Sequence, residues 1–255
     1  LHATTSPLHL LMMWFCYTEI DMNIEKITIP CTAYEIAADW YEGNDNVLLV
    51  LPGFTSSKKN YEPLVSAIVE KTGISALVID YSGHGESPFD IQDITISENF
   101  SEVVRAYDWL KEKYPDRTID VMGTSYGGFF AAKLPSVREI RKMILRVPAN
   151  YDPKDLYTPW RKLDREQIRN EYRVDPKNFT NHPVLAEAAH FKGDACVLTH
   201  EFDESCPKAS TDPFISAFNA ETWEAKGFVH GFGASNASGE QIEEYQTKLA
   251  EWLKK

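Results

Sequence analysis

The stretch Ile119 to Phe130 constrains the fold of this chain more than any other part of the sequence. A short apolar run leads into Gly123-Thr124-Ser125-Tyr126-Gly127, and residues that can open a helix follow. This Gly-x-Ser-x-Gly pattern, in that setting, is typical of a strand, a sharp turn and a helix. Such a turn strains the backbone of the central serine, and the two glycines let neighbouring backbone pass close by. We therefore expect the Ser125 hydroxyl to stand above a sheet, next to the positive end of a helix, as a candidate nucleophile.

Short apolar runs recur along the chain, and turn residues bound them. Runs of this kind form strands that are buried on both faces, as in a parallel sheet. Besides the run before Ser125, they are Val47 to Leu51, Ser75 to Asp80, Lys142 to Val147, Asp194 to His200 and Ala220 to Lys226. Ile24 to Tyr41 alternates instead, which predicts two antiparallel strands.

Segments with helical spacing separate these runs. Tyr61 to Lys71 ends before Gly73, which suits a helix C-cap, and we expect Ser97 to cap the next helix. Ser238 and Gln241 have the spacing of a capping box for a C-terminal helix. Strands that alternate with helices predict an α/β fold, with a mostly parallel central sheet and helices on both faces.

We expect residues 22–255 to form a single α/β domain. Two segments lie outside the alternation of strands and helices: residues 1–21, before this domain, and residues 148–191, within it. Residues 1–21 contain an apolar run that is too short to span a bilayer and lacks the features of a secretory signal. We expect this extension to pack as an arm on its own domain or on a second subunit, as in a homodimer. Residues 148–191 carry five prolines and scattered aromatic residues. We expect a helical cap there, over the carboxyl ends of the strands, with a surface excursion as the alternative.

The charge and the cysteines limit the partners of the chain. Its net charge of −12 argues against nucleic acid, which needs a basic face. An ordinary acidic protein and one adapted to salt both remain open. The cysteines are too far apart for a Cys-x-x-Cys unit, so we expect free thiols in a cytoplasmic protein and no metal site. They are Cys16, Cys31, Cys196 and Cys206.

Four motifs, in chain order, carry a resemblance to a known family. They are Leu51-Pro52-Gly53-Phe54, the run from Asp80 to Ser87 (Asp-Tyr-Ser-Gly-His-Gly-Glu-Ser), Gly123 to Gly127, and His230 after the last strand. Together they resemble the α/β-hydrolase superfamily, and within it the small capped esterases and lipases, such as monoacylglycerol lipases and feruloyl esterases. The resemblance covers roughly Met22 to the C-terminus and implies the α/β-hydrolase fold with a helical cap insertion.

The resemblance implies a catalytic triad in the chain order serine, acid, histidine. Ser125 would be the nucleophile, and His230 would be the general base, because imidazole titrates near neutrality. The other histidines lack the setting of His230, and for His84, inside a Gly-His-Gly turn, we expect a structural role.

Asp203, in the loop after the penultimate strand, matches the position of the acid in the family. Its neighbours Glu201 and Glu204 are alternatives. Asp152 is a further one, since it follows the strand that carries the acid in some relatives.

The family's oxyanion hole consists of two backbone N–H groups, which the resemblance assigns here to Tyr126 and Phe54. This chain has Pro52 where a histidine often precedes the glycine. Proline removes one donor, but Phe54 keeps its own N–H, so the hole can still form.

The resemblance thus implies a cofactor-independent serine hydrolase that cleaves small-molecule carboxylic esters through an acyl-enzyme. A thioesterase or acyltransferase uses the same triad, and Gly-x-Ser-Tyr-Gly-Gly also resembles prolyl-oligopeptidase-type peptidases. From outside the enzymes, a small-molecule receptor without turnover is the alternative, because a fold does not fix a function. The cap aromatics suit either a hydrophobic substrate group or the packing of the cap itself.

Overall fold

The computed structural model describes residues 23–44, 46–232 and 237–255. The extension expected over residues 1–21 lies outside them, and so does Cys16. Within the described residues no helix is both long enough and apolar enough to cross a membrane.

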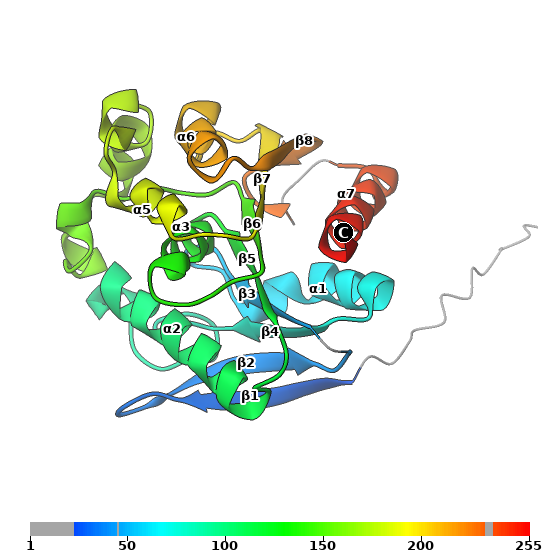
Figure 1. Cartoon of the computed structure of the whole chain (residues 1–255). Helices are drawn as coiled ribbons and strands as arrows, with labels where there is room; N and C mark the ends of the chain where they lie inside the picture. The colour runs from blue at the N-terminus through cyan, green and yellow to red at the C-terminus, as the bar shows by residue number, and fades with distance from the viewer. Residues whose placement is uncertain (1–22, 45, 233–236) are drawn as a thin grey trace, which may run out of the picture.

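The centre of the fold is an eight-stranded sheet in the order β1-β2-β4-β3-β5-β6-β7-β8 (Figure 1). The first two strands pair in antiparallel fashion, and β2 also runs antiparallel to β4. All pairs from β4 to β8 are parallel. The strands are β1 Ile24–Pro30, β2 Glu35–Tyr41, β3 Val47–Leu51, β4 Ser75–Ile79, β5 Ile119–Thr124, β6 Lys142–Arg146, β7 Asp194–Phe202 and β8 Glu221–Val229. The predicted strands and the mostly parallel sheet are confirmed.

Helices cover both faces of the sheet because alternate strand residues face two separate cores. Leu48 and Val50 of β3 pack in one core cluster with residues of α1 and α7, while Leu49 and Leu51 pack in another with residues of α2, α3 and α6. Figure 1 shows α1 and α7 together on one side of the sheet. The long helices are α1 Lys58–Thr72, α2 Ile96–Lys113, α3 Tyr126–Lys133, α6 Lys208–Phe218 and α7 Gly239–Lys254.

The ends of the helices test the expected caps. Gly73 closes α1 in the left-handed conformation, with φ 74°, and Ser238 forms a capping box with Gln241 at α7, as predicted. The expected cap at Ser97 is wrong, because α2 begins two residues earlier. Thr95 is its N-cap, since Thr95 and Glu98 form the reciprocal hydrogen bonds of a capping box.

The chain between β6 and β7 forms a series of short helical segments. Within it Trp160, Ile168 and Val184 are buried in the same core cluster as the residues of α3. The segment therefore packs against the body of the fold. Its elements are η3 Pro153–Asp155, η4 Trp160–Lys162, α4 Arg165–Gln167, the π-helical turn η5 Ile168–Tyr172, η6 Pro176–Phe179, α5 Pro183–Ala186 and η7 Glu187–Ala189. The remaining short helices are η1 Ile91–Asp93 and η2 Leu134–Ser136.

The sheet order brings the loops of the predicted site to one edge. β3 and β5 are neighbours, and Leu51 pairs with Gly123 near their carboxyl ends. The residues that follow, Phe54 and Ser125, therefore leave the sheet side by side. Because β7 and β8 are parallel to β5, the loops after them, with Asp203 and His230, open at the same edge.

Candidate active site

Ser125 occupies a strained turn between β5 and α3. Its φ of 52° and ψ of −108° lie outside the regions that residues with a side chain normally adopt. The turn is tight because its glycines touch backbone: a Cβ atom on Gly123 would lie 2.2 Å from the carbonyl oxygen of Gly127. The Ser125 N–H donates to the carbonyl oxygen of Arg146, 2.9 Å away, which ties the turn to β6.

The structure brings Ser125, His230 and Asp203 together. The Ser125 Oγ atom lies 2.9 Å from His230 Nε2, and His230 Nδ1 lies 2.7 Å from Asp203 Oδ2. Ser125 is nearly buried, while about a quarter of the His230 side chain (28 %) is exposed. This is the arrangement in which a carboxylate orients an imidazole that faces a hydroxyl.

The loop after β7 holds the Asp203 carboxylate in place. Its Oδ1 atom accepts hydrogen bonds from the N–H groups of Ser205 and Cys206, both 2.8 Å away, and the side chain is only 2 % exposed. One oxygen is thus fixed by backbone, and the other is left for His230.

The alternative acids have other partners. Glu201 accepts from the Gly227 N–H at 3.0 Å, and Asp152 caps η3 and pairs with Lys154. Glu204 is exposed to solvent. Of the four acids considered from the sequence, Asp203 is the one hydrogen-bonded to His230.

Two backbone N–H groups next to Ser125 are available to a ligand. Tyr126 is the first residue of α3, so its N–H has no partner within the helix. In the loop after β3, the Gly53 N–H donates to the Tyr61 hydroxyl at 3.0 Å. The Phe54 N–H donates to no residue in the described part of the chain. These are the two groups expected to form the oxyanion hole.

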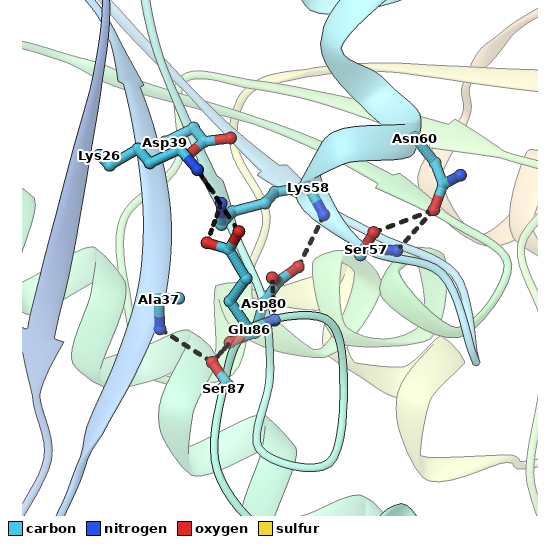
Figure 2. A network of polar contacts seen from close by, with 9 residues as sticks. All are labelled: Lys26, Ala37, Asp39, Ser57, Lys58, Asn60, Asp80, Glu86 and Ser87. Carbon is cyan, nitrogen blue, oxygen red and sulfur yellow. Dashed lines mark hydrogen bonds and ion pairs between the residues drawn. The ribbon is translucent and has the colours of Figure 1, made fainter.

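A polar network, buried except for the exposed Glu86 side chain, anchors the start of α1 directly after that loop (Figure 2). The Asp80 carboxylate accepts from the Lys58 N–H at 2.6 Å and from the Glu86 N–H at 2.9 Å. The Lys58 ammonium group pairs with Asp39 and Glu86, both at 2.8 Å. A Cβ atom on Gly85 would lie 2.0 Å from Asp80 Oδ2, so the turn closes tightly on this carboxylate. The network joins β2, α1 and the loop after β4.

His84, from the Gly-His-Gly turn, packs beside the expected oxyanion hole. Its ring lies 5.8 Å from the Phe54 ring and 6.1 Å from the Tyr126 ring. Its Nδ1 atom is 3.1 Å from the Ser82 carbonyl oxygen. Burial lowers the pKa of His84. The structural role expected for this residue stays a prediction.

A second buried network, which the sequence did not indicate, ends beside His230. Arg146 can only donate, so the Tyr245 hydroxyl accepts from Arg146 Nε at 2.7 Å. Tyr245 then gives its own proton to His200 Nε2 at 3.1 Å, and His200 Nδ1 donates to the Val229 carbonyl oxygen at 2.6 Å. Burial and the charge of Arg146 lower the pKa of His200 to about 4. The network therefore holds a neutral imidazole against the residue that precedes His230.

Ser125 and His230 open into a cavity of about 870 Å³. Phe54, Tyr61 and Phe232 line one part of it, and Tyr151 and Trp160, from the segment between β6 and β7, line another. The Trp160 ring lies 4.1 Å from the Phe54 ring.

The described residues hold no cluster of three or more histidine, cysteine or acidic side chains that suits a metal ion. Cys31, Cys196 and Cys206 are free thiols. Burial raises the pKa of Cys206 to about 11, so this thiol is neutral at physiological pH.

A strand that leads through a strained serine turn into a helix, in a mostly parallel sheet, defines the class of α/β-hydrolase proteins. The sequence matches the family model of the alpha/beta hydrolase fold over residues 46–216, more than half of the chain, and the protein belongs to this family. The resemblance noted in the sequence is thereby confirmed at the level of family and fold.

Solved structures with the same fold include several esterases. The esterase Pf2001 from Pyrococcus furiosus superposes with a TM-score of 0.69 at 21 % identity, over 93 % of this chain and 94 % of that one. Est1E from Butyrivibrio proteoclasticus, solved with bound ferulic acid, superposes with a TM-score of 0.68 at 18 % identity, over 89 % of this chain and 97 % of that one. An acylaminoacyl peptidase from Pyrococcus horikoshii gives 0.69 at 13 % identity, over 94 % of this chain but 42 % of that one. Identities this low show a shared fold.

Proposed function

We propose that this protein is a serine hydrolase that cleaves carboxylic esters without a cofactor. The observation that carries the proposal is the continuous contact from the Asp203 carboxylate through both nitrogens of His230 to the Ser125 hydroxyl. The solved proteins with this fold include the esterase Pf2001 and an esterase from Pyrobaculum calidifontis, which supports the same class of reaction here.

In the first half of the reaction, His230 Nε2 accepts the proton of Ser125 as its oxygen attacks the ester carbonyl. Asp203 keeps the proton-bearing Nδ1 of the imidazole turned toward itself and stabilises the cation that forms. The N–H groups of Phe54 and Tyr126 would bind the oxyanion of the tetrahedral intermediate, where one such donor typically contributes about 3 kcal/mol to the lowering of the barrier. His230 then protonates the leaving alcohol, and an acyl-Ser125 remains.

In the second half, water takes the place of the alcohol. His230 removes a proton from this water, which attacks the acyl-Ser125 carbonyl, and the free acid leaves as Ser125 regains its proton. Each step uses groups of the chain and water alone.

We also propose that residues 148–191 act as the cap of this site. The proposal is supported by Tyr151, Trp160 and Ile168, which line the cavity that contains Ser125. Trp160 packs on Phe54, so the segment covers the loop that carries one oxyanion donor.

The experiment is a hydrolysis assay with p-nitrophenyl esters from acetate to dodecanoate. Wild type is compared with Ser125→Ala and with Ser101→Ala, a serine on the exposed side of α2. Turnover by wild type and Ser101→Ala, but not by Ser125→Ala, is expected. Folded wild type that hydrolyses none of these esters would overturn the proposal, and thioesters, peptides and receptor ligands would then be screened.

A further inference from the structure

The charge of the cavity is opposite to the charge of the chain. The protein carries a net charge of −12, with 38 acidic and 26 basic residues. Among the described residues, however, four arginines and one glutamate line the cavity that contains Ser125. They are Arg146, Arg165, Arg169, Arg173 and Glu166. Such a concentration of one sign of charge inside a low-dielectric cleft attracts ligands of the opposite sign.

None of these four arginines forms an ion pair with a described carboxylate. The arginines that do form ion pairs lie elsewhere, and they are Arg105, Arg117, Arg138, Arg141 and Arg161. Arginine stays protonated in proteins, so the cavity holds positive charges that no described carboxylate neutralises at ion-pair distance.

Arg146 is the more buried of the two innermost arginines, with 1 % of its surface exposed. Its described hydrogen bonds run from Nε to the Tyr245 hydroxyl and from Nη1 to the Thr124 hydroxyl at 3.1 Å. Burial raises the pKa of Tyr245, so this partner is neutral. Arg146 also lies 5.5 Å from the Phe232 ring, a weaker stabilisation than an anion would give.

Arg173 is 8 % exposed and has the same kind of surroundings. It donates to the carbonyl oxygens of Asn150 at 3.3 Å and Ser205 at 3.2 Å, and it lies over the Tyr151 ring. Cys206, 3.7 Å from Nη1, is a neutral thiol. Asp203 attracts Arg173 through space, but its two oxygens are bonded to His230 and to backbone N–H groups.

A buried charge without a partner is energetically unfavourable, and an anion that enters the cavity would offset this cost. A guanidinium group uses five N–H donors and binds a carboxylate or phosphate through two parallel hydrogen bonds. Among the described residues, Arg146 Nη2 donates to no acceptor, and the further side-chain partner of Arg173 is the neutral hydroxyl of Tyr151, so neither guanidinium group uses all five of its N–H donors on the protein.

We propose that the substrate is an ester that carries a separate anionic group, a carboxylate or a phosphate, which the cavity arginines Arg146 and Arg173 bind. This inference rests on the proposed ester hydrolysis and names its substrate class. The anionic group gives binding energy and orientation, while Ser125 attacks the ester bond elsewhere in the same molecule.

Matched esters test the inference. The neutral members are phenyl acetate and ethyl hexanoate; the anionic members are para-carboxyphenyl acetate, para-phosphonooxyphenyl acetate and monoethyl adipate. We expect at least one anionic ester to have a kcat/KM at least tenfold higher than that of its neutral partner. A charge-assisted hydrogen bond contributes enough binding free energy for a change of this size. The three anionic arms identify whether carboxylate or phosphate is preferred, and on which side of the ester.

The variants are Arg146→Gln and Arg173→Gln. The ratio of anionic to neutral kcat/KM is expected to fall about tenfold in Arg146→Gln or Arg173→Gln. It should stay unchanged in the control Arg105→Gln, which lies on α2 outside the cavity. In wild type, sodium chloride should raise KM for the anionic ester and leave KM for the neutral ester unchanged. This test uses wild type alone, so it does not depend on the folding of a variant.

The outcomes separate this inference from the proposed function. Ser125-dependent hydrolysis of neutral esters with no preference for any anionic partner, and no effect of salt on KM, would overturn the inference alone. Failure to hydrolyse any ester would overturn the proposed function. Binding is then read in Ser125→Ala, where benzoate, adipate or phenyl phosphate should raise the melting temperature and benzyl alcohol should not.

Discussion

Gly127 lies so close to Leu51 that a Cβ atom on Gly127 would be 2.0 Å from the Leu51 carbonyl oxygen. This contact joins the first turn of α3 to the end of β3. It sets the distance between Ser125 and the loop that carries Phe54, because both segments leave the sheet from these two neighbouring strands. The second glycine of the motif is therefore a packing requirement of the site.

Gly127→Ala should destabilise the protein by about 3 kcal/mol or more, since the atom it would displace belongs to a buried strand. Urea unfolding measures this change. The control is Gly239→Ala, at the first position of α7, where an added Cβ atom meets nothing within 4 Å. That change should be neutral or stabilise by up to about 1 kcal/mol. Equal stability of the two variants would contradict the argument.

Asp203→Asn should reduce kcat on p-nitrophenyl butyrate by about 10⁴-fold with little change in stability. The N–H groups of Ser205 and Cys206 require an acceptor at the Oδ1 position. The amide nitrogen of asparagine would then face His230 Nδ1 and donate to it, which leaves the proton on Nε2, where Ser125 needs an acceptor.

Glu204→Gln makes the same charge change one residue away, on an exposed side chain. It should keep kcat within a factor of two or so of wild type, because distant surface charge changes have small effects. If Asp203→Asn kept near-normal turnover, another group would have to orient His230.

The free energy of unfolding should fall as the pH drops from about 6.5 to about 4. The pKa of His200 is about 4 in the folded protein and near 6.5 in the unfolded chain, so the unfolded state binds more protons between these values. One such group removes up to about 1.4 kcal/mol per pH unit and about 3 kcal/mol in all. Burial also lowers the pKa of His84 and of His182, which adds to the loss.

Unfolding by urea between pH 7.5 and pH 4.5 measures this slope. His200→Gln should flatten it, although its stability at pH 7.5 is lower than that of wild type. His190→Gln, at an exposed histidine, should leave the slope as it is. A slope that is the same in wild type and His200→Gln would show that His200 does not carry the effect.

Much of the fold followed from the sequence because the parallel strands are buried on both faces. Such strands read as uninterrupted apolar runs, and β3 begins and ends where the run from Val47 to Leu51 does. The prediction of α2 was less accurate at its start. Thr95 and Ser97 are both able to cap a helix, and the difference lies in Glu98, which completes a capping box with Thr95 alone.

The sequence did not predict α6, Lys208–Phe218. Pro213 within it and its small polar residues match no helical pattern, and the helix forms because Phe214 and Phe218 pack into the core. Tertiary contact thus decides its structure, which local spacing does not show.

For the site, the sequence predicted the residues that a motif marks. In the structure His230 lies within hydrogen-bond distance of both Ser125 and Asp203. Nothing in the sequence indicated Arg146 or Arg173. Arg146 ends a short apolar run and Arg173 stands in a polar, charged stretch, where an arginine reads as an ordinary surface residue. Only the fold shows that both are buried beside a cavity.

Lys58→Met should destabilise the protein by about 3–5 kcal/mol, the usual cost of removing one partner from a buried ion pair. Asp39, 6 % exposed, would lose its cation at 2.8 Å. The double variant with Asp39→Asn should regain part of this loss, because the buried negative charge is then gone as well. Lys59→Met, at the exposed neighbour on α1, is the control and should change stability by less than about 0.5 kcal/mol.

The same variant tests whether the network supports the site. Lys58 is the first residue of α1, and the loop that carries Phe54 ends directly before it. If the network holds that loop, Lys58→Met should lower kcat at a temperature where the variant is fully folded, because a displaced Phe54 N–H stabilises the oxyanion less. Normal kcat in a folded but less stable variant would limit the network to stability. A loss of kcat that Lys59→Met does not share would connect the ion pair in Figure 2 to the chemistry at Ser125.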